Sequence, residues 1–440
     1  VLNSRLSMGE RYDQFRRAKL GEIQIMVGPR SALFTPFSNL GLIIIDEEHE
    51  QTYKSENSPR YHAREVAVQR AVQEGAHVVL GSATPSLEAY SRAVSGEYLL
   101  TKLTARFENR PLPEVSVVDL REELKAGNRS ILSRKLKNSI EKRLRNNEQS
   151  ILFLNRRGYA GFVSCRSCGE ALKCPHCDVA LTEHNNGKLV CHYCGYERLR
   201  VEQCPSCGSP YIGGFKAGTQ QIEQVLHKTF PKARVLRMDY DTTRNKGSYE
   251  QILSSFAAHE ADILVGTQMI VKGHDFPDVT LVGAVAADLS LNAADYRCAE
   301  RTFQLLTQAV GRSGRGNKPG EAVIQTYHPE HYSIQTAATQ DYEAFYREEM
   351  SILAAGEDEE LLSQGMDYLG RFVERIGEKY HLHVIGPAYA SVGKINDVYH
   401  KVIYLKHQEE RVLMDIKDKA EKYIEVNSGF RKLYIQFDYS

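Results

Sequence analysis

Apolar and polar residues alternate along the first part of the chain in a pattern that predicts strands joined by amphipathic helices. Short apolar runs occupy 22–28, 40–46 and 76–81, and a helical pattern covers 62–73. Continuous apolar strands separated by helices are typical of a parallel sheet with both faces covered. We therefore predict an α/β unit with a parallel sheet over residues 1–95.

A second unit of the same kind follows, with six predicted strands at 114–120, 150–156, 233–239, 262–267, 280–288 and 321–327. We assign residues 96–162 and 211–335 to this lobe, with 163–210 as an insertion. The tail, 336–440, combines helical stretches with three strand-like runs. It predicts a small α+β domain, so the whole chain is of the α/β class.

Composition adds little to this picture. Lys plus Arg and Asp plus Glu both total 56 in 440 residues, so no global charge indicates a nucleic-acid partner. No apolar run is long enough to cross a bilayer, which favours a cytoplasmic protein. The locally basic stretch 129–149 has an apolar stripe at Leu136, Ile140 and Leu144, so we interpret it as a solvated helix rather than a DNA contact.

Eight of the nine cysteines form four CxxC pairs, which is the spacing of structural zinc ligands. A hairpin over 178–190 favours one site from the two inner pairs and another from the outer pairs, while a sequential pairing stays open. The two expected sites are Cys165, Cys168, Cys204 and Cys207 (zinc 1), and Cys174, Cys177, Cys191 and Cys194 (zinc 2).

Disulfide bonds and histidine ligands are less favoured than two four-thiolate zinc sites. Disulfides are disfavoured because the sequence shows no secretory signal at its start. His176, His184 and His192 lie near or inside the CxxC turns, but eight thiolates suffice for two zinc ions, so we predict that they are not ligands. Cys298 lies on a helical pattern and is predicted to be a small core residue.

An acidic group, Asp46, Glu47, Glu48 and His49, directly follows an apolar strand. Ligands of open α/β sheets bind at the carboxyl ends of strands, so a magnesium nucleotide is expected here. Asp46 would hold Mg²⁺ through water, and Glu47 would polarise the attacking water. The alternative is an acidic amino terminus of the next helix, which the helix dipole also favours.

Three further segments favour the nucleotide interpretation. Residues 81–86 (GSATPS) follow the next strand and include Thr84. The segment 263–282 places Thr267, Lys272, Gly273 and Asp275 just past a strand. The segment 308–316 (QAVGRSGRG) brings Gln308, Arg312 and Arg315 after a helix. Arginine suits a transferring phosphoryl group because its planar fork stays charged.

In this order the four segments resemble motifs II, III, V and VI of superfamily 2 helicases, and the eight-cysteine insertion resembles that of the PriA family of primosomal replication-restart helicases. The resemblance implies two RecA-like lobes, the first truncated, and the cofactors ATP and Mg²⁺. It implies a 3′ to 5′ DNA helicase that acts on stalled forks and D-loops in the nucleoid. The implied partners are single-strand binding protein, other primosome proteins and the replicative helicase.

The same resemblance assigns roles to individual residues. Motifs II and VI imply catalytic roles for Asp46, Glu47, Glu48, His49, Arg312 and Arg315. Nucleotide contacts are implied for Gly273, Asp275 and Gln308. DNA contacts are implied for Thr84, Thr267 and Lys272. Segment 154–161 resembles motif IV, with Arg156 and Arg157 facing nucleotide or DNA.

Residues 53–64 resemble the aromatic-rich loop that follows motif II in the family. Tyr53, Tyr61 and His62 would stack on unpaired bases, while Lys54, Arg60 and Arg64 would meet phosphates. Many relatives place a tryptophan in this loop, and this chain contains none. A solvated polar loop is the alternative interpretation.

Two features depart from the family pattern. The sequence contains no GxxxxGK[ST] phosphate-binding loop, so we expect a fragment without the amino-terminal domains and without ATPase activity of its own. The tail lacks a proline-containing stretch near residue 353, which predicts an internal deletion, a lost first strand and an exposed sheet edge.

Other functions stay possible at this stage. A zinc-ribbon DNA-binding or protein-docking adaptor on degenerate ATPase lobes is the main alternative. A type I restriction or transcription-coupled translocase is disfavoured, because it predicts no insertion with paired four-cysteine sites. Zinc held by four thiolates has no open coordination position, so we expect the insertion to dock partners and separate strands rather than catalyse.

Overall fold

The computed structural model forms two compact units, Val1–Arg92 and Ala93–Ser440, which are described separately. The described residues are 1–440 except 4–5, 56, 95, 105, 107–109, 155–161, 178, 185–186, 193, 215–217, 246, 272–275, 292–296, 348–349, 357, 396–397, 408–409 and 440. Among them, no helix is both long and apolar enough to span a membrane.

The first unit is built on two parallel strands, paired from Leu42 with His77 to Asp46 with Gly81. Helix α2 begins after His62, whose side chain caps it, and ends at Gly75 in the left-handed conformation. The elements of the unit are α1 (Met8–Lys19), η1 (Arg30–Phe34), β1 (Leu42–Asp46), η2 (Gln51–Tyr53), α2 (Ala63–Glu74), β2 (His77–Gly81) and α3 (Leu87–Val94).

The strand predicted over 22–28 is wrong. This segment runs as a loop, held to the start of the chain by a hydrogen bond from Leu2 N to Val27 O of 2.7 Å. Its apolar side chains do not reach a core, since Ile25 is 79% exposed. An apolar run becomes a strand only where a neighbouring strand supplies a ladder. Within the described part of the unit, β1 and β2 pair only with each other.

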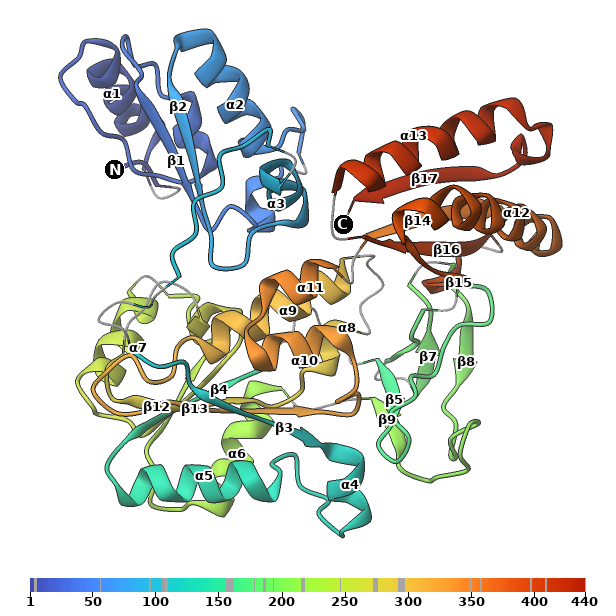
Figure 1. Cartoon of the computed structure of the whole chain (residues 1–440). Helices are drawn as coiled ribbons and strands as arrows, with labels where there is room; N and C mark the ends of the chain where they lie inside the picture. The colour runs from blue at the N-terminus through green and yellow to red at the C-terminus, as the bar shows by residue number, and fades with distance from the viewer. Residues whose placement is uncertain are drawn as a thin grey trace. The chain divides into compact units, whose positions relative to one another are not determined.

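The second unit contains a six-stranded parallel sheet in the order β10-β11-β4-β12-β13-β3, and all six predicted strands are confirmed. Helices cover both faces, with α5 and α6 on one side and α9 and α10 on the other (Figure 1). The strands are β3 (Glu114–Asp119), β4 (Gln149–Phe153), β10 (Val235–Met238), β11 (Ile263–Gly266), β12 (Val279–Ala284) and β13 (Glu321–Thr326).

The helices around this sheet bury one apolar stripe each. On α5, Leu136 and Ile140 are fully buried against strand residues such as Leu152 and Leu281. Arg143 is buried on the same face and pairs with Glu321 at 2.9 Å, whereas Arg134, Lys135, Lys142 and Arg145 are exposed, as expected of a solvated helix. The helical elements are α4 (Leu120–Lys125), α5 (Arg134–Arg145), α6 (Thr219–Thr229), α7 (Ser248–Ala257), η4 (Gln268–Val271), α8 (Asp288–Leu291), α9 (Cys298–Val310), α10 (Tyr332–Thr339) and α11 (Tyr342–Arg347).

The cysteine-rich insertion leaves the sheet after β4 and returns before β10. Its first and last strands pair antiparallel, from Val163 with Gly214 to Cys165 with Ile212, so the two ends of the insertion lie together. A three-stranded sheet, β6-β7-β8, lies between them. The strands are β5 (Val163–Cys165), β6 (Thr182–Glu183), β7 (Lys188–Val190), β8 (Glu197–Leu199) and β9 (Ile212–Gly214).

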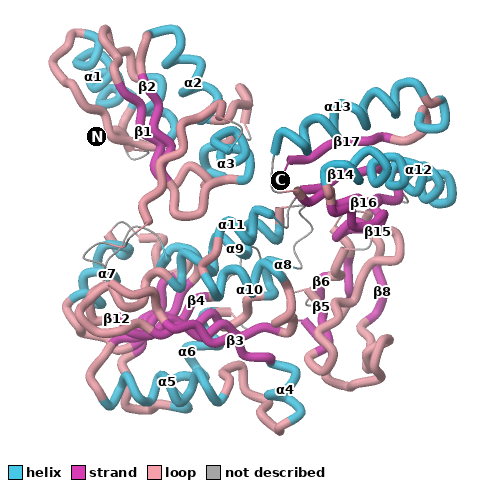
Figure 2. Tube along the Cα trace, viewed as in Figure 1, coloured by secondary structure: helices cyan, strands magenta, loops and turns pink. Residues whose placement is uncertain are grey.

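The tail forms an α+β domain around a four-stranded antiparallel sheet in the order β15-β16-β14-β17 (Figure 2). Leu369 of α12 and Ile416 of α13 pack in one core with Ile403 of β16. The elements are β14 (Met350–Gly356), α12 (Glu359–Gly377), η5 (Glu378–Tyr380), β15 (His383–Ile395), β16 (Val398–Lys406), α13 (Glu410–Val426), η6 (Ser428–Phe430) and β17 (Tyr434–Tyr439).

The expected loss of a first strand in this domain stays a prediction, but the junction itself lies within an inner strand and not at a sheet edge. Strand β14 spans residue 353 and hydrogen-bonds to β16 on one side and β17 on the other. The internal deletion itself stays a prediction.

Candidate functional site

Motif II lies at the carboxyl end of β1, where the chain turns sharply. Asp46 is exposed, and its Oδ1 accepts a hydrogen bond of 3.0 Å from the backbone of Glu47. Glu47 has a φ of 47°, a left-handed conformation that is uncommon outside glycine. The Tyr53 hydroxyl donates to the carbonyl of Asp46 at 2.8 Å. Burial, with the Asp46 carboxylate nearby, raises the pKa of Tyr53.

Glu48 points the other way, into a buried ion pair. Its carboxylate accepts hydrogen bonds from Ser86 N at 2.5 Å and Ser86 Oγ at 3.0 Å, and it pairs with the buried Arg64 at 3.2 Å. His49 Nδ1 lies 2.7 Å from Ser82 Oγ. Motif II is therefore tied to motif III by two side-chain links, and Glu48 itself is withdrawn from solvent.

In the loop after motif II, some of the predicted DNA-contacting residues are exposed, and others are held by contacts within the protein. Lys54 and Arg60 are exposed. Tyr61 packs edge-on against Phe34 at 5.3 Å, and His62 caps α2 through Nδ1. Thr84 of motif III is fully buried, so the structure as it stands does not present it to a ligand. Of the predicted phosphate contacts, Arg64 is occupied by its pair with Glu48.

Motif VI is a glycine-rich loop after α9 that packs against the start of β12. Gly314 has a φ of +68° and donates to Val279 O, and a Cβ there would lie 2.5 Å from Gly320 N. Arg315 donates to the Gly311 carbonyl at 3.0 Å. Arg312 is buried, and Gln308 is half-buried on the last turn of α9.

Arg106 reaches the same loop, and sequence reasoning missed it. Its Nη2 donates to the Gly311 carbonyl at 3.2 Å, beside the guanidinium of Arg315. Burial, and secondly the charge of Arg315, lowers the pKa of Arg106. An isolated arginine carries no sequence pattern that would have marked it.

Motif V is described only in part. Thr267 follows β11 and is half-buried, and its carbonyl accepts a hydrogen bond from Ile270 at 3.1 Å. Lys272, Gly273 and Asp275 lie outside the described residues, as do Arg156 and Arg157 of the segment resembling motif IV. Their predicted roles stay predictions.

The eight insertion cysteines gather into two four-thiol groups: Cys165, Cys168, Cys204 and Cys207, and Cys174, Cys177, Cys191 and Cys194. This is the nested pairing, not the sequential one. Sulfur atoms within each group lie 3.6 to 3.8 Å apart where they approach most closely. A disulfide requires about 2.05 Å. Zn–S bonds of about 2.3 Å at a tetrahedral centre place sulfurs about 3.8 Å apart, so both groups fit zinc.

The backbone of three of the CxxC turns has a shape that suits metal binding. Gly169, Gly195 and Gly208 follow the second cysteine of three turns, each with positive φ, and each donates to the carbonyl of the first cysteine. Backbone amides of Ser167 and His176 also point at the sulfurs of Cys165 and Cys174, both at 3.4 Å. Such donors stabilise thiolates. The glycines were the signal that sequence reasoning overlooked.

The remaining candidates lie outside the two four-thiol groups. None of His176, His184 and His192 has a ring nitrogen within either group. His176 packs edge-on against Tyr196 at 5.6 Å. Cys298 is buried at the start of α9, as expected of a small core residue. Burial raises the pKa of the Cys168 thiol to about 12.

The cysteine site for zinc 1 is anchored directly to the lobe that contains the parallel sheet. Arg166, inside the first CxxC turn, donates to the carbonyl of Arg129 at 3.1 Å and to the Tyr327 hydroxyl at 3.3 Å. A Cβ on Gly169 would lie 3.2 Å from the Tyr327 carbonyl, so the turn and the lobe approach closely. The cysteine-rich insertion is thus held against the carboxyl end of β13.

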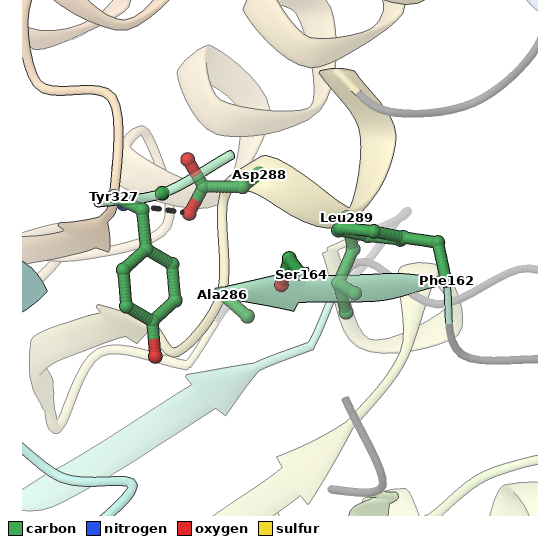
Figure 3. Close-up of a pocket in the computed structure, with 7 residues that line it drawn as sticks. Phe162, Ser164, Ala286, Asp288, Leu289 and Tyr327 are labelled. Carbon is green, nitrogen blue, oxygen red and sulfur yellow. Dashed lines mark hydrogen bonds between the residues drawn. The ribbon is translucent and has the colours of Figure 1, made fainter. Parts of the chain in front are cut away.

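A small pocket at this junction shows the contact (Figure 3). Phe162 and Ser164 of the insertion face Ala286, Asp288, Leu289 and Tyr327 of the lobe. Asp288 accepts hydrogen bonds from Thr326 Oγ1 at 2.6 Å and Tyr327 N at 2.9 Å. Burial raises the pKa of Asp288. The loop after β12 is thereby fixed to the end of β13.

Comparison with known proteins agrees with this arrangement. A family model described as "PriA DNA helicase Cys-rich region (CRR) domain" matches residues 174–198, and one described as "Helicase conserved C-terminal domain" matches 214–317. Replication restart protein PriA of Bacillus subtilis is 48% identical over 435 residues, covering 95% of this chain and 54% of that protein. The Synechocystis protein of the same name is 44% identical, covering 92% and 52%.

The chain thus spans about half the length of the curated relatives it matches. Among solved structures, RecG bound to a three-way DNA junction is 14% identical with a TM-score of 0.41, covering 79% of this chain and 35% of that one. That likeness is too weak to carry an argument.

The parallel sheet, the motif segments and the family matches define a helicase-type protein with a zinc-binding insertion. The chain belongs to the family of the replication restart protein PriA.

Proposed function

We propose that the protein containing this chain is an ATP-dependent DNA helicase of replication restart, moving 3′ to 5′ and acting at stalled forks and D-loops. The observation that carries the proposal is the zinc-binding insertion between β4 and β10 of a lobe whose residues 214–317 match the helicase carboxyl-terminal model. We place it in the cytoplasm, at the nucleoid.

The residues of motifs II and VI suit phosphoryl chemistry. Asp46 presents an exposed carboxylate at a strand end, and carboxylate oxygens are preferred ligands of Mg²⁺. Glu47, in the left-handed turn beside it, is suited to orient and polarise a water. Arg315 and Arg312 bring guanidinium groups that suit a developing negative charge. When bound, ATP supplies the γ-phosphoryl group whose transfer drives movement.

The cysteine-rich insertion suits docking rather than catalysis. Both zinc sites have four thiolates and therefore no open coordination position. Arg166 fixes zinc 1 to the lobe, which suits a module that must move with that lobe. Its proposed contacts are the separated strands, single-strand binding protein, other primosome proteins and the replicative helicase.

The proposal is tested by ATP hydrolysis and by strand displacement on forks with single-stranded 3′ or 5′ tails, using the whole protein. Glu47→Gln should abolish DNA-stimulated hydrolysis and unwinding while DNA binding persists. Glu22→Gln, an exposed carboxylate of the same unit, should leave both unchanged. Displacement that requires a 5′ tail would contradict the polarity, and full hydrolysis by Glu47→Gln would contradict the role of motif II.

A polypeptide limited to these 440 residues contains no GxxxxGK[ST] loop, so we expect it to bind DNA without hydrolysing ATP. Measurable DNA-stimulated hydrolysis by it would contradict this. If the whole protein also bound forks without hydrolysis, the adaptor function would replace the helicase.

A further inference from the structure

Two histidines of the cysteine-rich insertion converge outside the four-thiol groups. His184 Nε2 and His192 Nε2 lie 3.3 Å apart, with ring centroids at 5.1 Å and a tilt of 59°. Both side chains are exposed, so a dissolved ion has access to them. Neither belongs to the two groups of cysteines.

The separation of the two nitrogens matches a shared metal ion. Zn–N bonds of about 2.05 Å at a tetrahedral centre place two nitrogens about 3.3 Å apart. Without a metal ion, the same two nitrogens are within reach of a ring-to-ring hydrogen bond, which metal binding would replace. The same geometric relation accounts for the sulfur separations in the cysteine sites.

The backbone on each side is already fixed. His184 N donates to Lys188 O at 2.9 Å, at the turn between β6 and β7. His192 lies inside the CxxC turn of Cys191 and Cys194, where Gly195 N donates to Cys191 O. Little backbone entropy is therefore lost on binding. Lys188, on the same hairpin, pairs with Glu197 at 2.6 Å, so its charge is offset.

We propose that His184 and His192 form a third, exchangeable metal site for Zn²⁺ or another borderline divalent transition-metal ion. Two imidazoles are the protein ligands, and water completes the coordination, in contrast to the closed four-thiolate sites. The ion bridges the β6–β7 turn to the Cys191–Cys194 turn and thereby stiffens the outer end of the insertion.

The test is a calorimetric titration of Zn²⁺ into the reduced protein that already carries two zinc ions. One further equivalent should bind, more weakly than the first two, and His184→Gln and His192→Gln should each weaken it at least tenfold. His176→Gln, in the same insertion, is the matched control and should bind as the parent does. Metal analysis must show two tightly held zinc ions in each protein compared.

A second measurement needs no variant. Diethyl pyrocarbonate labelling, read by mass spectrometry, should show His184 and His192 protected by the third equivalent of Zn²⁺, while the exposed His227 on α6 is labelled equally with and without it. Absence of a third binding event, binding that neither substitution weakens, or absence of protection would each overturn the proposal.

Discussion

At the scale of single residues, the first unit depends on one buried charge pair. Glu48 and Arg64 are both removed from water, and Ser86 completes their hydrogen bonds. A buried carboxylate with three donors is stable only while all three remain, since an unpaired buried charge is costly. The sequence of motif II assigned Glu48 and Glu47 the same catalytic role, because a sequence does not reveal which of two adjacent carboxylates is buried.

Glu48→Ala should destabilise the first unit by about 3 kcal/mol, because Arg64 would lose its buried partner and keep only the half-exposed Glu65 as a counter-charge. Glu22→Ala breaks a half-exposed pair with Arg17 and should cost less than about 1 kcal/mol. Urea denaturation, with hydrogen exchange of peptides from residues 42–92, measures both. Equal effects of the two substitutions would show that the buried pair contributes no more than a surface one.

His331 gives the second unit a predictable response to acid. Its Nδ1 accepts a hydrogen bond from Ser333 N and caps α10, so the imidazole must be neutral in the fold. Burial, and secondly His328, lowers the pKa of His331 to about 4 from 6.5, with Glu330 opposing. Between these values the unfolded chain binds the extra proton, so stability falls as pH falls.

From pH 7 to pH 5, the titration of His331 should lower the free energy of unfolding by about 2 kcal/mol. His331→Asn keeps a cap without titrating and should remove that part of the pH dependence in urea denaturation. His227→Asn, on the exposed face of α6, is the control. A pH dependence of the same size in the His331→Asn protein would refute the assignment.

At the scale of elements, the hydrophobic pattern was sufficient to predict a strand wherever the segment pairs with neighbouring strands. The six strands of the second unit were predictable because each is a short apolar run, and the four inner strands are buried between helices. The run at 22–28 has the same composition and is not a strand, because pairing depends on neighbours that local sequence does not specify. Strand β14 shows the converse, since its place between β16 and β17 is set by residues far along the chain.

The motif VI loop should be intolerant of side chains at Gly314. Gly314→Ala combines a positive φ with a Cβ 2.5 Å from Gly320 N. We therefore expect it to lower the free energy of unfolding by at least about 3 kcal/mol. Gly127 also has positive φ but open space around it, so Gly127→Ala isolates the conformational cost of about 1–2 kcal/mol. Thermal or urea denaturation compares the two, and equal losses would rule out the steric contribution.

At the scale of the whole molecule, the second unit combines three cores that the sequence order had already separated. The parallel sheet, the cysteine-rich insertion and the tail domain each bury their own apolar cluster. Cysteine spacing identified the metal sites because ligands come from local turns. Arg166 and Arg106 escaped notice because they act on carbonyls far along the chain, at Arg129 and Gly311.

Removal of zinc should therefore act locally. Chelation should leave eight thiols crowded in the insertion core, and hydrogen exchange should rise in peptides covering 163–214. Peptides of β11 and β12 should keep their protection, because the core of the parallel sheet contains none of the zinc-binding cysteines. Simultaneous loss of protection in both regions would contradict this independence.

The antiparallel pairing of β5 with β9 has a consequence beyond fixing the insertion in place. Because Val163 and Gly214 lie side by side, the insertion leaves and rejoins the lobe at neighbouring points, as a short loop would. The metal-binding segment can thus be lengthened, exchanged between relatives or replaced by a few residues without altering the register of β4 and β10. A lobe built this way can therefore change its metal-binding segment while its own folding stays unchanged.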